Sequence, residues 1–170
     1  MTREDAVNLV DYHYWARDRI LDGVEVLTPA QYTQDLASSF TSVRDTVVHI
    51  YGAEVNWYLR WIGNSPTGFP DPAQFPDVTS IRAAWKSHEQ KLRSLVASLA
   101  SSNELDRKLR YRTFDGQEME SVFAHMLQHV VNHASYHRGQ ITTMLRQLGA
   151  PAPKPQDLIR FYRECATRVH

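Results

Sequence analysis

Residues 125–141 read HMLQHVVNHASYHRGQI, with a histidine at every fourth position. Four residues advance an α-helix by about 400°, so each of these histidines lies about 40° around the helix from the last and one turn further along. We therefore expect a long helix from about Glu118 to Leu148, with this flank facing the core, because apolar residues share it at helical spacing. The apolar residues on the flank are Val122, Met126, Ile141, Met144 and Leu148. The histidines are His125, His129, His133 and His137.

The histidine spacing predicts a metal site. Neutral imidazoles that face an apolar core without partners would each cost about 1–3 kcal/mol, and a metal ion would satisfy several of them at once. His133 and His137, at i and i+4, can share one ion because their rings lie one helical turn apart. His49, inside another predicted helix, is the best-placed third ligand. Three nitrogens leave coordination positions open, as in catalytic sites, and water would fill them.

The residues next to these three have less certain roles. His129 lies one turn before His133 and can be a hydrogen-bond partner of a ligand, a cavity-lining residue or a core residue. We expect His125 to take no part in the metal site. Asp45, one turn before His49, is placed to orient that imidazole. Glu54 lies about 140° around the helix from His49 and is less suited to the same metal.

Other metal centres are excluded by spacing. A zinc-protease His-Glu-x-x-His motif needs a glutamate where this chain has Ala134. Di-iron bundles need Glu-x-x-His pairs, and no glutamate here has a histidine three residues later. Cys165 is the only cysteine, so an intramolecular disulfide, cysteine-rich metal sites and covalent haem are excluded. We expect Cys165 to be buried, and His13, His88 and His170 to be ordinary hydrogen-bonded histidines.

Length and charge limit the function classes. The 170 residues fit one domain over 1–170, and 19 basic residues balance 19 acidic ones. Without an excess of positive charge we expect no nucleic-acid binding. No stretch of about 18 apolar residues occurs, so we expect no membrane association and a cytoplasmic location.

The pattern is helical almost throughout and predicts an all-α four-helix bundle. The expected helices cover residues 6–27, 42–63, 79–99 and 118–148, with Ser42 capping the second and Thr79 or Ser80 the third. Gly63 to Asp77 holds four prolines and predicts a surface loop able to cover a site. Leu105 to Gly116, which closes with Asp-Gly, predicts a short extended arm or hairpin. A short amphipathic helix over 156–168 completes the chain, with Leu158, Phe161, Tyr162, Cys165 and Val169 on its apolar side.

Two segments carry a family resemblance: the run from His129 to Ile141, and Val48-His49-Ile-x-Gly52-Ala-Glu54-x-x-Trp57. Together with Tyr14-Trp15 and the Leu148-Gly149 ending, they resemble the DinB-like superfamily over essentially the whole chain. The resemblance implies an up-down-down-up four-helix bundle. It also implies that His49, His133 and His137 bind a divalent metal ion: nickel, zinc or iron.

The resemblance further implies thiol chemistry, because characterised members include mycothiol-dependent maleylpyruvate isomerase and bacillithiol transferases. We therefore expect a metal-dependent thiol S-transferase or isomerase that acts on a small molecule, with a low-molecular-weight thiol as cosubstrate. The alternatives are a metal-dependent hydrolase, a non-catalytic metal-binding oligomeric bundle, and a metal-free structural bundle. We also expect a homodimer, and no residue is identified as the general base.

Overall fold

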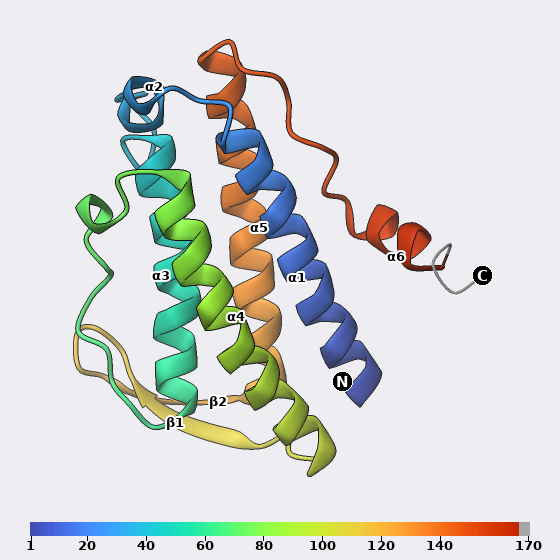
Figure 1. Cartoon of the computed structure of the whole chain (residues 1–170). Coiled ribbons are helices and arrows are strands. Elements are labelled where there is room, and N and C mark those ends of the chain that lie inside the picture. The colour runs from blue at the N-terminus through green and yellow to red at the C-terminus, as the bar shows by residue number, and fades with distance from the viewer. Residues whose placement is uncertain (167–170) are drawn as a thin grey trace.

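Four long helices form the body of the protein. The computed structural model describes residues 1–166, and the helices are α1 (Arg3–Val24), α3 (Val43–Trp61), α4 (Val78–Ser101) and α5 (Phe123–Gln147). In Figure 1, α1 and α5 run upward while α3 and α4 run downward. The long loop between α3 and α4 lets these two helices point the same way. The bundle is therefore up-down-down-up, as predicted.

Side-chain caps explain where the helices begin. Thr2 and Asp5 form a capping box on α1, and Ser42 Oγ accepts the Asp45 backbone N–H at the start of α3. The predicted cap of α4 was wrong: Asp77, not Thr79 or Ser80, accepts the Ser80 backbone N–H, at 2.7 Å. A carboxylate at this position also suits the positive end of the helix dipole.

The short elements differ more from the sequence prediction. Residues 118–122 are not the start of α5 but strand β2 (Glu118–Val122), paired antiparallel with β1 (Lys108–Arg112). Gly116, at φ +85°, turns the chain back on itself, so residues 118–122 satisfy their backbone groups across the hairpin. An extended arm or hairpin was predicted here, but residues 118–122 were assigned to the following helix rather than to the second strand.

Three further short helices complete the described chain. α2 (Pro29–Thr33), capped by Thr28, was not predicted, and η1 (Pro72–Gln74) interrupts the loop between α3 and α4. α6 (Leu158–Ala166) confirms the C-terminal helix, but only Phe161 is buried on it and Cys165 is half-buried rather than buried. Val169 and His170 lie outside the described residues. No helix in the described part of the chain has both the length and the apolar character needed to cross a membrane.

The core lies between the four long helices and contains one carboxylate. α1 packs against α4 and α5, and α3 packs against α5. Glu54 is fully buried and accepts hydrogen bonds from Tyr14 Oη at 2.7 Å and Trp85 Nε1 at 2.8 Å, with His13 Nε2 at 2.6 Å. Burial alone would raise the pKa of Glu54, but His13 and the other partners outweigh it and hold the pKa below its usual range. His13 is thus a hydrogen-bonded core histidine, as predicted.

Candidate metal centre

Three histidines from two helices meet at one point. His49 comes from the middle of α3, and His133 and His137 lie one turn apart on α5. His133 Nε2 lies 3.0 Å from His49 Nε2 and 3.0 Å from His137 Nε2. The ligand atoms of all three lie within 4.8 Å of one another, so this cluster can hold a metal ion. The structure therefore brings together the three residues that the sequence singled out.

The hydrogen bonds around His137 fix its proton. Its Nδ1 lies 2.7 Å from Gln140 Oε1, and an amide oxygen can only accept, so Nδ1 carries the hydrogen. The Nε2 atom of neutral His137 therefore presents a lone pair to the cluster. This arrangement, in which one ring nitrogen donates to a protein oxygen and the other is free, is typical of metal-binding histidines.

A count of protons shows why a cation suits the cluster. With His137 Nε2 unprotonated, both 3.0 Å contacts can be hydrogen bonds only if they share the single hydrogen of His133 Nε2. A cation where the lone pairs converge would satisfy all three nitrogens. Nitrogens at the usual metal distance of about 2.0–2.1 Å lie about 2.9 Å apart when they subtend 90° at the ion. The donor set and its spacing therefore fit a divalent metal.

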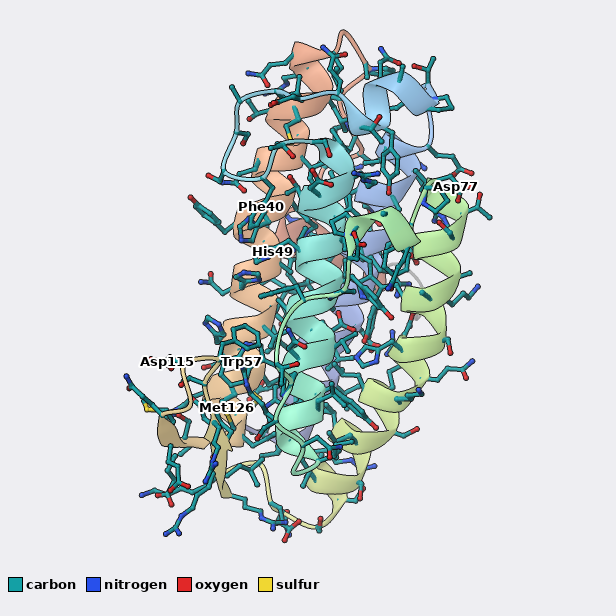
Figure 2. The ribbon with its side chains drawn as sticks, turned by 90° about the vertical axis from the view of Figure 1, so that its left-hand side faces the viewer. Phe40, His49, Trp57, Asp77, Asp115 and Met126 are labelled. Carbon is teal, nitrogen blue, oxygen red and sulfur yellow. The ribbon has the colours of Figure 1, made fainter. Side chains whose placement is uncertain are left out.

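Two phenylalanines pack on the ring of His49. Phe40, just before α3, stacks on it with ring centroids 4.0 Å apart, and Phe69, from the loop between α3 and α4, stacks on it at 4.8 Å. Figure 2 shows Phe40 beside His49, with Trp57 lower on the same helix and close to the hairpin. The loop thus contacts the site, as the sequence suggested. Its aromatic side chain limits the access of water to one ligand.

These surroundings keep His49 and His133 neutral. Burial, and then the neighbouring His137, lower the pKa of His49 to about 4. Burial, followed by His137, His49 and His129, also lowers the pKa of His133 to about 4. At neutral pH both side chains are uncharged, which is the form that binds a metal.

The other sequence candidates lie elsewhere. His129 is exposed, with its ring centroid 6.0 Å from that of His133 and 5.4 Å from that of Trp57. His125 is also exposed, so the prediction that all four histidines face the interior was wrong. Asp45 does not orient His49: its carboxylate accepts hydrogen bonds from Thr41 and Arg44 at the start of α3. In the first turn of a helix, that carboxylate is closer to the preceding loop than to the next turn.

Gln140 is the functional residue that the sequence analysis missed. It lies three residues after His137, a spacing that places two side chains on the same face of a helix. A search for polar residues at i+3 or i+4 from each predicted ligand would have found it.

Comparison with known proteins identifies the family and supports this fold. A model of the DinB family matches residues 1–164. The chain belongs to the DinB family. Protein DinB from Bacillus subtilis (strain 168) is 29% identical over 161 residues, which covers 92% of this chain and 94% of that protein. The resemblance noted in the sequence is therefore confirmed.

Two solved structures share the fold of this DinB family member. YfiT from Bacillus subtilis, described as a probable metal-dependent hydrolase with an unusual four-helix bundle topology, superposes with a TM-score of 0.65. It is 18% identical, over 88% of this chain and 90% of YfiT. A DinB-like protein from Bacillus cereus ATCC 10987 gives a TM-score of 0.55 at 21% identity, over 86% of this chain and 95% of that one. Both likenesses support the four-helix bundle.

Proposed function

We propose that His49, His133 and His137 bind one divalent cation and that the protein is a metal-dependent enzyme acting on a small molecule. The observation that carries this proposal is the convergence of three Nε2 atoms, one of them fixed as a lone-pair donor by Gln140. Three protein ligands leave room for water or substrate on the ion, as catalytic sites require. Nickel, zinc and iron all accept imidazole ligands, so the donor set does not select among them.

The bound ion would act as a Lewis acid that lowers the pKa of a coordinated water or thiol. The protein's own side chains have separate tasks. The three histidines hold the ion, Gln140 keeps His137 in the binding tautomer, and Phe40 and Phe69 shield one side of the site. His129, exposed and one turn from His133, is placed to carry protons between the site and solvent.

The donor set favours thiol transfer or isomerisation over hydrolysis. The cluster formed by the described residues contains imidazoles and no carboxylate, so it offers no strong general base for activating water. A thiol needs less help, because its own pKa is about 8.5 and coordination to a metal removes the proton outright. We therefore propose a thiol S-transferase or isomerase that uses a low-molecular-weight thiol as cosubstrate.

Metal-dependent hydrolysis is the second candidate. It is supported by YfiT, which shares the fold and is described as a probable metal-dependent hydrolase. Hydrolysis would require the ion to lower the pKa of the attacking water, whose proton would pass to solvent or to His129.

The two candidates can be separated with tag-free protein, stripped of metal and reloaded with zinc, nickel or iron(II). One set of assays combines glutathione or cysteine with chlorodinitrobenzene, and the other uses p-nitrophenyl esters. We expect metal-dependent turnover in the thiol set that is lost in His133→Ala. Turnover in the ester set alone would favour hydrolysis. If the metal raises the melting temperature but no assay shows turnover, the non-catalytic metal-binding bundle is favoured. The homodimer stays a prediction that light scattering can check.

A further inference from the structure

A second polar cavity lies beside α5, away from the histidine cluster. Its volume is about 620 Å³, and it is an open cavity lined by α1, α5 and the segment that leads to α6. Arg138 forms part of its wall and directly follows His137 in the sequence, but the two side chains point to different helices. His137 contacts His49 of α3, whereas Arg138 Nη2 donates to Tyr12 Oη of α1 at 3.3 Å. The cavity is therefore separate from the metal centre.

Arg138 is a buried cation without a charged partner. Only 3% of its surface is exposed. Its Nη2 atom donates to Ser135 Oγ at 2.8 Å and to Tyr12, which are both neutral oxygens. Within the described chain its Nε and Nη1 atoms have no hydrogen-bond partner, and no carboxylate lies within ion-pair distance. An unpaired buried charge is strongly unfavourable, so an anion close to this guanidinium would stabilise it.

The remaining charges on the cavity wall are also mostly positive. Arg146 and Lys154 line it, and neither forms an ion pair with any of residues 1–166. Asp157 is the acidic residue on the wall, so three positive charges face one negative charge, a net charge of +2. A concave surface with this charge concentrates small anions.

The wall is held in place on the side formed by the segment after α5. Tyr12 Oη donates to Gln156 O at 3.1 Å, and Arg19 Nη1 donates to Pro155 O at 3.0 Å. Gly23 allows close packing here, because a Cβ on it would lie 2.8 Å from Pro153 Cβ. Figure 1 shows this segment descending beside α1 and α5 to reach α6. By contrast, a Cβ on Gly139, which lines the cavity, would meet nothing within 4 Å.

We propose that this cavity binds a small molecule carrying phosphate or carboxylate groups. Arg146 and Lys154 would bind its anionic groups, and the unpaired charge of Arg138 would stabilise them through the cavity wall. Guanidinium and ammonium groups together are a common recognition set for both oxyanions. The volume is that of a metabolite-sized ligand rather than a single ion. This inference does not rest on the proposed function, because it concerns residues that take no part in the metal site.

Calorimetric titration of metal-free protein with inorganic phosphate, and separately with citrate, tests the proposal. We expect saturable binding of at least one anion at one site, and the tighter of the two identifies the chemical class. Arg146→Gln/Lys154→Gln should weaken that binding at least tenfold. The control Lys86→Gln/Lys91→Gln removes two exposed positive charges from α4 and should change it less than twofold. Repeating the titration in His133→Ala should leave the affinity unchanged, which separates this cavity from the metal centre.

Gly139→Leu tests the location independently, because its side chain would extend into the cavity from a position with free space around the Cβ. We expect it to abolish anion binding while the melting temperature without ligand stays within a few degrees of wild type. The proposal is overturned if neither anion binds saturably. It is also overturned if the two double variants weaken binding equally, or if a folded Gly139→Leu protein binds as wild type does.

Discussion

His137 is held on both sides of its ring, by Gln140 at Nδ1 and by His133 at Nε2. The first contact determines which nitrogen has a free lone pair, and the second places that lone pair in the cluster. Gln140 would therefore act on a bound metal through His137, without being a ligand itself. Such partners set both the tautomer and the orientation of a ligand ring.

Replacing Gln140 with leucine tests this role. We expect Gln140→Leu to weaken metal binding by about 10–100-fold, the usual cost of losing a partner of a ligating histidine. Competition with a chromophoric chelator measures the affinity. Gln147→Leu, an exposed change in the last turn of α5, is the matched control and should bind as wild type does. Equal affinity in both variants would show that Gln140 has no part in the site.

The lowered pKa values of His49 and His133 predict how the metal-free protein responds to acid. Each pKa is about 4 in the folded protein and about 6.5 when the chain unfolds. Between these values the unfolded chain binds more protons, so the free energy of unfolding falls as the pH is lowered through this window. Above pH 6.5 the contribution is fully present.

Urea unfolding at several pH values between 4.5 and 7 measures this effect. A His49→Gln/His133→Gln variant should lose less stability across the window than wild type does. The same slope in both proteins would contradict the assignment of neutral, buried imidazoles.

Local helix geometry explains which of the histidines could be predicted. One step of four residues turns about 40°, so His133 and His137 stay together, but three steps turn about 120°. His125 has therefore rotated out of the bundle, which the pattern of equal steps conceals. His49 could be predicted because it lies at the centre of a helix of suitable length. The prediction that Asp45 orients His49 was wrong because the partners of Asp45 depend on the fold of the preceding loop.

At the scale of elements, Gly52 allows the loop between α3 and α4 to reach the metal centre. A Cβ at this position would lie 2.6 Å from Pro70 Cδ and 2.9 Å from Phe69 Cδ1. Asn56, one turn further along α3, donates from Nδ2 to Gly68 O at 3.0 Å and ties the loop down. The surface of α3 thus positions Phe69 on His49.

Gly52→Ala should displace this loop and reduce stability by about 1–3 kcal/mol, as overpacking of a close contact usually does. Denaturant unfolding measures the change, and a longer distance between labels on the loop and on α5 would report the displacement of the loop. Gly139→Ala is the matched control, since its Cβ meets nothing within 4 Å and alanine favours the helix by up to about 1 kcal/mol. If both variants are as stable as wild type, the close approach is not required.

The elements with strong helical periodicity were predicted, and the errors arose where two kinds of structure compete. Residues 118–122 continue the spacing of α5, but the Gly116 turn brings them alongside β1, and pairing across the hairpin prevails. Similarly, α2 has too few residues for any periodicity to be visible. Tertiary contacts determine the secondary structure of such segments, and these contacts cannot be deduced from the residue spacing of a single sequence.

At the scale of the whole molecule, Glu54 joins three of the four long helices. It lies on α3 and binds His13 and Tyr14 of α1 and Trp85 of α4. These contacts bring helices that are distant in sequence into one arrangement. The sequence placed Glu54 away from the metal, but its role in the core depends on partners from other helices.

Glu54→Ala should destabilise the protein by about 3–5 kcal/mol, because it leaves buried polar partners without their acceptor. Urea unfolding monitored by circular dichroism gives the value. Glu25→Ala removes an exposed carboxylate paired with Arg82 and should cost at most about 1 kcal/mol. A loss of less than 1 kcal/mol for Glu54→Ala would show that the buried network contributes little to the fold.

The proposed function requires one ion bound by His49, His133 and His137. Elemental analysis of tag-free protein purified with divalent metals present tests it directly, with single alanine variants of these residues and His125→Ala as control. We expect about one equivalent of metal in wild type and in His125→Ala, and far less than one in each of the three ligand variants. Full metal content in the ligand variants, or none in wild type, would contradict the account.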